Sequence, residues 1–294
     1  MDNPQINPLS KFFRQPKLWL NLPSSGSFYP AGSLIKTENG EYPVLAMTAK
    51  DEITIKTPDA LMNGQATVDL IQSCVPNIKN AWNVPSIDID AILIAIRIAS
   101  FGNDIDIDLT IPNTDITRTY TTDLSNSLTS IMNAAFDSTV ELDNGFTIEV
   151  RPLTYREFTQ NAIKTLEEQR IVSVLNSSEL SDSDKLVRFN ASFKTLTDIN
   201  INMVTTAITS ITTPDGTKVV KPEFIKEFID NADSDFYVKV IKHLEIQRDK
   251  FKMPNLKVIT TAEERKEGAP DEFETPMTLD FSHFFERGSS QSRT

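Results

Sequence analysis

Few residues in this chain could perform acid–base or nucleophilic chemistry, and they are scattered. His243 lies beside the apolar face of an expected helix and His283 lies between aromatic residues, settings in which histidine more often packs than acts as a base. The chain has no G-x-G-x-x-G, G-x-x-x-x-G-K-[ST], H-E-x-x-H or G-x-S-x-G motif, and its nine glycines leave little material for phosphate-binding loops. We therefore predict that the protein is not an enzyme, although its 41 acidic residues leave the carboxylate pair of a glycosidase open as an alternative.

A possible metal site begins at Asp104, Asp106 and Asp108, because an EF-hand calcium loop opens with the same D-x-D-x-D run. The sixth position of such a loop needs glycine, and this chain has Leu109 there. The aspartates alternate with isoleucines, which is typical of a strand with one solvated face. Cys74 is the only cysteine, so no internal disulfide or multi-cysteine zinc site can form; burial of this thiol is a more common fate than reactivity. We predict no metal site and no cofactor.

Arg97 interrupts the most apolar segment of the chain. Between Ala91 and Phe101, only Arg97 and Ser100 are neither aliphatic nor aromatic, and a helix that is apolar on every side must be enclosed on every side. A buried guanidinium keeps its proton and therefore needs a carboxylate or several carbonyls around it. We predict a helix that Asp90 opens and Gly102 ends, with Arg97 as a structural ion-pair residue whose candidate partners are Asp51, Glu52 and Asp90.

The overall composition narrows the class of protein. The 294 residues are enough for one large domain or two ordinary ones, and the formal net charge of −12 argues against a nucleic acid partner. The chain starts Met1-Asp2 with no basic and apolar leader, and its longest apolar run is shorter than the ~20 residues of a membrane span. We expect a globular protein that is neither secreted through a signal peptide nor membrane-spanning.

Residues 1–30 carry five prolines interspersed with aromatic residues, a composition that favours an extended arm. Two readings of this arm are equally supported. It lies over its own domain, or its aromatic side chains insert into a neighbouring subunit, the candidates for such docking being Phe12, Phe13 and Trp19.

Turn and periodicity signals predict a mixed lobe over residues 31–152. We expect a hairpin at 33–46, helix starts at TAKDE and TPDAL, and a short helix at 66–73. A strand at 104–111 pairs with one at 117–122, and a helix at 124–136 precedes a hairpin that turns at 143–145.

Residues 153–252 read as a mainly helical lobe. Thr154 and Glu157 form a capping box, and a helix at 184–211 has a heptad seam interrupted by Asn200. Such an asparagine fixes the register of a self-pairing coiled coil, or it bonds a neighbouring helix within one chain. We favour the second reading because Ile201, Val204 and Ile208 widen the apolar stripe; self-association through helix 184–211 stays open.

The last part of the chain contains further hairpins. A hairpin at 211–220 leads to a helix that starts at Pro222, and a further helix is capped by Ser234. Residues 253–294 are expected to form a C-terminal hairpin, with a charged loop, and an aromatic tail. The expected fold class is therefore α+β, and the ends of the chain, up to residue 21 and from residue 281, are expected to order only on partners. Further candidate docking residues in the tail are Phe281, Phe284 and Phe285.

Several motifs resemble one known family. The order LPSSGSFYP, MTAKDE, TPDALMNG, LIQSCV and DIDAILIAIRIASFG, with LDFSHFF near the end, is similar to the baseplate hub and hub-assembly proteins of T-even-type contractile-tailed bacteriophages. The resemblance covers residues 22–285 and is most specific at 47–101. Some family members carry paired cysteines at hairpins matching 105–122 and 258–281, which suggests metal-bound ribbons. This chain has none there, so apolar packing must hold any such shape.

The resemblance implies a structural component of the tail baseplate in its hub region, docking other hub and tail-tube-proximal proteins through its terminal segments. It would be assembled in the host cytoplasm and retained in the virion. An assembly factor that leaves after hub formation is the alternative, and a tail-associated cell-wall hydrolase is a third reading.

Overall fold

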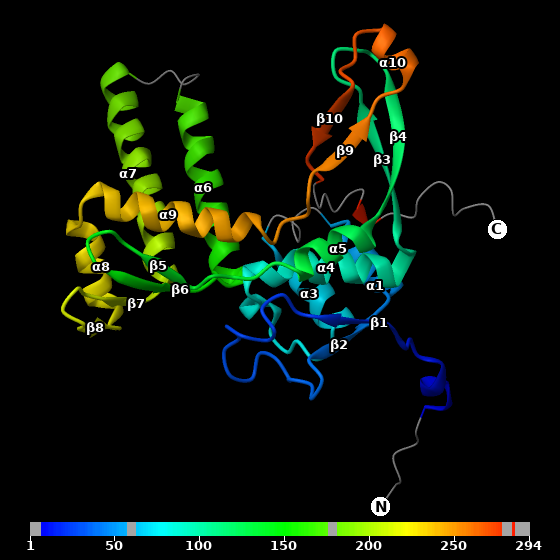
Figure 1. Cartoon of the computed structure of the whole chain (residues 1–294), viewed down its shortest axis with the longest axis horizontal. Helices are drawn as coiled ribbons and strands as arrows, with labels where there is room; N and C mark the ends of the chain where they lie inside the picture. The colour runs from blue at the N-terminus through cyan, green and yellow to red at the C-terminus, as the bar shows by residue number, and fades with distance from the viewer. Residues whose placement is uncertain (1–6, 58–62, 176–180, 278–283, 286–294) are drawn as a thin grey trace, which may run out of the picture.

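A computed structural model describes residues 7–57, 63–175, 181–277 and 284–285. Helices combine with small antiparallel sheets, which confirms the α+β class and the order of a mixed lobe, a mainly helical lobe and a C-terminal hairpin (Figure 1). Among the described residues, no helix has the length and apolar character that a membrane crossing requires.

The first core is built around one apolar helix, α4 (Ser86–Phe101). Its isoleucines Ile92, Ile94 and Ile96 are completely buried, as the sequence predicts for a helix without a polar face. The helix starts four residues before Asp90, and Gly102 ends it with φ 88°. The elements of this core are β1 (Pro16–Asn21), β2 (Glu41–Leu45), α1 (Ala49–Ile55), α3 (Gln65–Cys74), η2 (Ala81–Asn83) and α5 (Leu124–Met132).

The expected hairpin at residues 33–46 is wrong. Strand β2 pairs with β1 instead, with Leu20 opposite Tyr42. The turn at Gly40 is present, but the residues before it are engaged elsewhere: Leu34 forms a bridge with Ile78, and the Ile35 amide donates to the Asn77 carbonyl. The turn signal was therefore correct, and the pairing partner came from the N-terminal arm.

Two hairpins form a separate projection beside the first core (Figure 1). One contains the predicted strands, β3 (Asp104–Thr110) and β4 (Thr117–Asp123), and the other contains β9 (Leu256–Ile259) and β10 (Glu272–Thr275), joined through α10 (Ala262–Lys266). Leu109, Leu256 and Val258 form the small apolar cluster between them. The aspartates of β3 accept hydrogen bonds from threonines of β4, Asp106 from Thr121 and Asp108 from Thr119, which agrees with the strand reading of this run.

A second large core lies in the helical part and is closed by a four-stranded antiparallel sheet in the order β5-β6-β7-β8. Its strands are β5 (Thr139–Glu141), β6 (Thr147–Val150), β7 (Ile208–Thr212) and β8 (Lys218–Val219). The helices around it are α6 (Tyr155–Leu175), α7 (Asp182–Ala207), α8 (Pro222–Asn231) and α9 (Ser234–Asp249). The division of the chain at residues 30, 152 and 252 stays a prediction, and the packing of β5 and β6 here favours an earlier second boundary.

Helix α7 is four residues shorter than the predicted helix 184–211 at its C-terminal end. Residues 208–211 pair with β6, because β-branched residues fit a pleated strand and the neighbouring strand supplies partners for their backbone groups. The capping box at the start of α6 is present: Glu157 accepts from the Thr154 amide, and Thr154 accepts from the Glu157 amide. The N-cap of α9 is Asp233, not the predicted Ser234.

Candidate functional site

The described side chains that could take part in catalysis are buried or form hydrogen bonds that hold the structure together. Cys74 is buried, and burial raises the pKa of its thiol to about 12, which removes it as a nucleophile at neutral pH. His243 hydrogen-bonds the Asp137 carbonyl through Nε2 at 2.9 Å, and His283 lies outside the described residues. Within the described ranges, no three His, Cys, Asp or Glu side chains are placed to hold a metal ion.

Two aspartates of α4, Asp88 and Asp90, have the strongly shifted pKa values that often mark acid–base sites. Burial raises the pKa of each to about 6. Asp88 is fully enclosed and accepts hydrogen bonds from Ser24 N (2.7 Å), Ser24 Oγ (2.6 Å) and the Tyr29 hydroxyl (2.9 Å). Asp90 accepts from the Met253 amide at 3.3 Å. Residues two apart on a helix do not face each other, so this arrangement is not an acid–base pair.

Arg97 is buried, but its partners are not the predicted carboxylates. Its guanidinium donates to three backbone carbonyls, those of Phe284 (2.7 Å), Gly102 (3.2 Å) and Asp104 (3.2 Å), and lies 4.9 Å from the Phe101 ring centroid. Of the candidate partners, Asp51 forms an ion pair with Arg14, and Asp90 accepts a hydrogen bond from the Met253 amide. No described ion pair joins Arg97 to Glu52. The electronegative carbonyls that a buried cation needs come from the C-cap of α4 at Gly102, from the start of β3 and from the C-terminal segment.

The described aromatic residues of the C-terminal tail are buried, although we predicted that they bind a partner. Phe284 and Phe285 are buried in the first core and contact each other edge to face, with ring centroids 5.0 Å apart. They are therefore not free to bind a partner, and their assignment as docking residues is wrong. Phe281 lies outside the described residues.

The N-terminal arm is where exposed aromatic side chains gather. The short helix η1 (Pro8–Phe12) has Asn7 as its N-cap and Pro8 as its first residue. The Asn7 side chain accepts a hydrogen bond from the Leu9 amide. Phe12 is 74% exposed, Phe13 59% and Trp19 57%. Isolated exposed apolar residues are common on proteins, whereas three large aromatic side chains within eight residues mark a candidate docking site.

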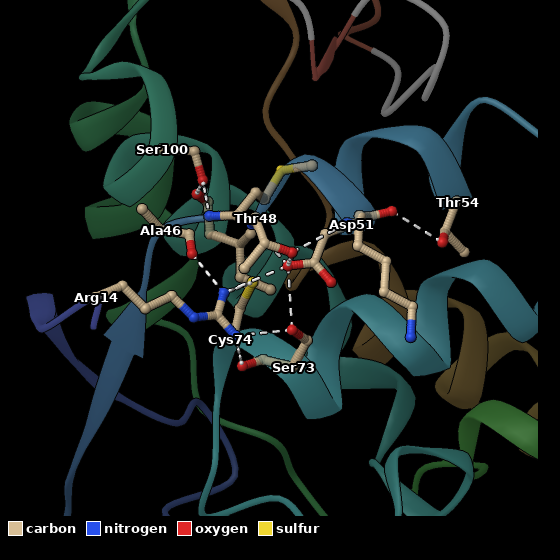
Figure 2. A network of polar contacts seen from close by, with 11 residues as sticks. Arg14, Ala46, Thr48, Asp51, Thr54, Ser73, Cys74 and Ser100 are labelled. Atoms are coloured by element: carbon tan, nitrogen blue, oxygen red, sulfur yellow. Dashed lines mark hydrogen bonds and ion pairs between the residues drawn. The ribbon is translucent and has the colours of Figure 1, made fainter. Parts of the chain in front are cut away.

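Arg14 fixes this arm to the body of the protein (Figure 2). Its Nη1 donates to the Ala46 carbonyl at 2.5 Å and to Asp51 Oδ2 at 3.3 Å, and its Nη2 donates to the carbonyl and hydroxyl of Ser73 at 2.6 and 2.8 Å. These contacts reach the end of β2, the start of α1 and the last turn of α3. We name Arg14, Asp51 and Ser73 the arm lock.

One oxygen of the lock's carboxylate receives several donors. Asp51 Oδ2 also accepts from Thr48 N (2.7 Å), Thr48 Oγ1 (2.8 Å) and Ser73 Oγ (3.1 Å), and Thr48 completes a capping box at the start of α1. A carboxylate oxygen with four donors fixes the positions of the groups that donate to it. The arm lock therefore orients a segment of chain.

Further contacts hold the remainder of the arm. Strand β1 pairs with β2, Leu20 and Leu22 are buried, and Asp88 anchors the loop at Ser24. In that loop Ser25 has φ 52° and Phe28 has φ 65°, conformations that non-glycine residues rarely adopt without such support. The expectation that the segment up to residue 21 orders only on partners is thus wrong for residues 14–21, which pack on their own domain.

The arm lock was not found from the sequence. The capping pattern at Thr48 and Asp51 was visible, and it marked a helix start without indicating that Asp51 also receives Arg14 from a distant segment. Arg14 itself is one basic residue among 29, and only its position beside Asp51 in space distinguishes it.

The comparisons with known proteins agree with the resemblance in the sequence. A sequence model of the family described as "T4 bacteriophage base plate protein" matches residues 34–265, which is most of the chain. No curated protein and no solved structure matched it. The matched segment includes α4, the second large core, most of the first core, and the strands β3, β4 and β9 of the paired hairpins. The chain therefore belongs to the family of T4 bacteriophage base plate proteins.

Proposed function

We propose that this structural protein of the phage tail baseplate occupies the hub region, where its N-terminal arm docks a neighbouring hub or tail-tube-proximal protein. It would assemble in the host cytoplasm and stay in the virion. The supporting observation is the combination of exposure and rigidity in the arm: Phe12, Phe13 and Trp19 are mostly exposed, yet Arg14 between them is fixed by the arm lock.

Rigidity matters because binding costs conformational freedom. A side chain that is already positioned loses less entropy on docking than one on a mobile tail. Aromatic side chains contribute most to binding energy where they enter a pocket of the partner, and here they stand on a short helix and an edge strand. The proposed docking residues are therefore Phe12, Phe13 and Trp19, without Phe284 and Phe285.

The state of the reactive groups supports a non-enzymatic role. Cys74 and Asp88 are completely buried. The Asp51 carboxylate of the arm lock holds the N-terminal arm and the start of α1 in place. The hydroxyls of Ser24 and Ser73 donate to Asp88 and Asp51 in contacts that hold the loop and the arm in place, which weighs against the hydrolase alternative.

The test uses the phage with its complete chain. Phe12→Ser and Phe13→Ser are introduced together, and Ile259→Ser, which removes a 73% exposed apolar side chain from β9, is the matched control. We expect the double variant to fold but to be lost from purified virions by quantitative mass spectrometry, and the control to be incorporated normally. Normal incorporation and infectivity of the double variant would contradict docking through the arm.

The same virions distinguish the alternatives. A structural hub component is present in a fixed number of copies, whereas an assembly factor that leaves is absent from wild-type particles. Purified protein that clears peptidoglycan in a zymogram would reinstate the hydrolase reading.

A further inference from the structure

Helices α6 and α7 form an antiparallel hairpin. One side of this hairpin is apolar, and α9 covers only the base of that side. Helix α9 crosses the base of the hairpin, and the two helices extend well beyond it (Figure 1). In the uncovered part, four large apolar side chains are exposed: Leu166 by 49%, Leu186 by 61%, Phe189 by 40% and Phe193 by 52%. We name these four residues the hairpin face.

Helical spacing places the four residues on one side. Leu166 is eight residues after Phe158, and Phe158 lines the cavity under α9. On α7, the steps from Leu186 through Phe189 and Phe193 lead to Asn200 and Met203, which line the same cavity with Ile241 and Leu244 of α9. The hairpin face is therefore the continuation of the stripe that α9 already covers at the base.

This geometry separates the two halves of the predicted heptad seam. Its lower half, with Asn200 and Met203, lines the cavity under α9; Asn200 is exposed there, and its bond to a neighbouring helix stays a prediction. The described residues leave the upper half of the seam uncovered. There the ring centroids of Phe189 and Phe193 lie 4.6 Å apart, and both side chains are exposed. The buried residues of α7 in this region, Ser192 and Ile199, are not residues of the seam.

The charge distribution singles out the hairpin as a place where two copies could meet. Helices α6 and α7 each carry three basic and three acidic residues and are neutral, whereas the whole chain has a net charge of −12. Between residues 186 and 197 the seam side of α7 has no charged residue, consisting of Leu186, Phe189, Asn190, Phe193, Leu196 and Thr197. Two acidic molecules can therefore approach through this side with little like-charge repulsion.

We propose that the hairpin face binds the hairpin face of a second copy of this chain, with the two hairpin tips pointing in opposite directions. Opposed tips follow from α9: with tips side by side, each α9 would occupy the space of the other. With tips opposed, each upper hairpin lies beside the partner's α9, and four helices enclose the apolar residues. The face on one copy is then complementary to itself, as a two-fold interface requires.

The expected dimer is weak. An aromatic side chain buries roughly 150–250 Å² when fully covered, so four large side chains near half exposure supply roughly 300–400 Å² of apolar area per copy. With polar rim residues added, the interface is at the low end of specific ones. We therefore expect dissociation in the micromolar range and a dimer that high local concentration favours.

Sedimentation velocity of the full chain between about 1 and 200 µM tests the pairing. The variants are Leu186→Glu and Phe193→Glu, and the matched control is Val187→Glu, which adds the same charge at a 68% exposed position next to the face but off the seam. We expect concentration-dependent dimers for the wild type and Val187→Glu, and monomers for the two face variants. All three substituted positions are exposed, so circular dichroism should show unchanged folding.

A monomeric wild type at the highest concentration overturns the proposal, as does equal disruption by Val187→Glu. If the isolated chain is monomeric and Phe193→Glu still blocks baseplate assembly, the face belongs to another protein. The outcome is independent of the hub position, because it is measured on purified protein.

The orientation has its own test. A nitroxide attached to Ser183→Cys reports the tip of α7, since native Cys74 is buried and does not compete for the label. For a pairing centred near residue 191, the two labels lie roughly 24 Å apart along the helices. A short distance, with tips side by side, would overturn the opposed arrangement.

Discussion

The guanidinium of Arg97 donates its Nε proton to the carbonyl of Phe284, at 2.7 Å and 187 residues further along the chain. The same group binds the carbonyls of Gly102 and Asp104, which follow directly after α4. One buried cation thus joins the end of the core helix, the start of β3 and the C-terminal aromatic segment. Burial lowers the pKa of Arg97 while the nearby Asp106 opposes that shift, and an arginine keeps its charge in either case.

Arg97→Ala should lower the free energy of unfolding by about 3–5 kcal/mol, because three buried carbonyls lose their donor and a cavity remains. Urea denaturation at neutral pH measures the loss. Arg170→Ala on the exposed part of α6 is the control and should change stability by less than about 0.5 kcal/mol. A loss below about 1 kcal/mol for Arg97→Ala would mean that the side chain is solvated in solution.

The buried Asp88 should make the protein less stable as the pH rises. Its folded pKa is raised by burial to about 6 from an ordinary 3.8, and the hydrogen bonds from Ser24 and Tyr29 only partly offset that effect. Between these values the folded state binds more protons than the unfolded state, so stability falls as pH increases through this window. Above pH 6 the full cost of the buried charge is present, on the order of 3 kcal/mol.

Asp88→Asn removes this titration while keeping groups that can bond Ser24 and Tyr29. We expect the variant to gain stability relative to the wild type by about 2–3 kcal/mol between pH 4 and pH 7. Urea unfolding across that range, expressed as variant minus wild type, cancels the other titrating groups. A difference that does not change with pH would show that Asp88 titrates normally.

Burial of Arg97 was predictable, and its partners were not. An arginine inside an apolar helix must be enclosed, so local composition was sufficient. Its partners are carbonyls, which every residue has, and one belongs to Phe284 at the far end of the chain. Sequence patterns identify side-chain types, and they carry no information on which backbone group a cation will meet.

The errors in the fold have a similar cause. The strand pair of residues 104–123 was correct because its alternation and turn are local. The misassigned hairpin at 33–46 and the overlong helix at 184–211 depended on distant strands, β1 and β6, which compete for the same segments. Phe284 and Phe285 were assigned to docking because an aromatic tail has the same composition whether it fills its own core or a partner's pocket.

Arg14→Gln should loosen the N-terminal arm. The guanidinium loses five close acceptor contacts, among them the ion pair to Asp51, and Arg14 is partly exposed, so we expect a stability loss of only about 1–2 kcal/mol. The sharper readout is faster amide exchange of residues 7–21 with unchanged protection in α4. Lys17→Gln, at an exposed position of β1, is the control. If exchange in the arm is the same in both variants, the arm lock does not hold the arm.

The two projecting hairpins should depend on apolar packing and not on metal. Val258 is completely buried between them with Leu109 and Leu256, and outside this cluster Arg118 contacts Glu264 at 3.2 Å and the Ile259 carbonyl at 3.3 Å. Val258→Ala should cost about 1–3 kcal/mol and increase amide exchange in β3, β4, β9 and β10 together, whereas Ile259→Ala, on the same strand but 73% exposed, should do neither. A chelator should leave Tm unchanged, because this chain has no cysteines in these hairpins to bind zinc. A fall in Tm on adding EDTA would instead reveal a metal held by other ligands.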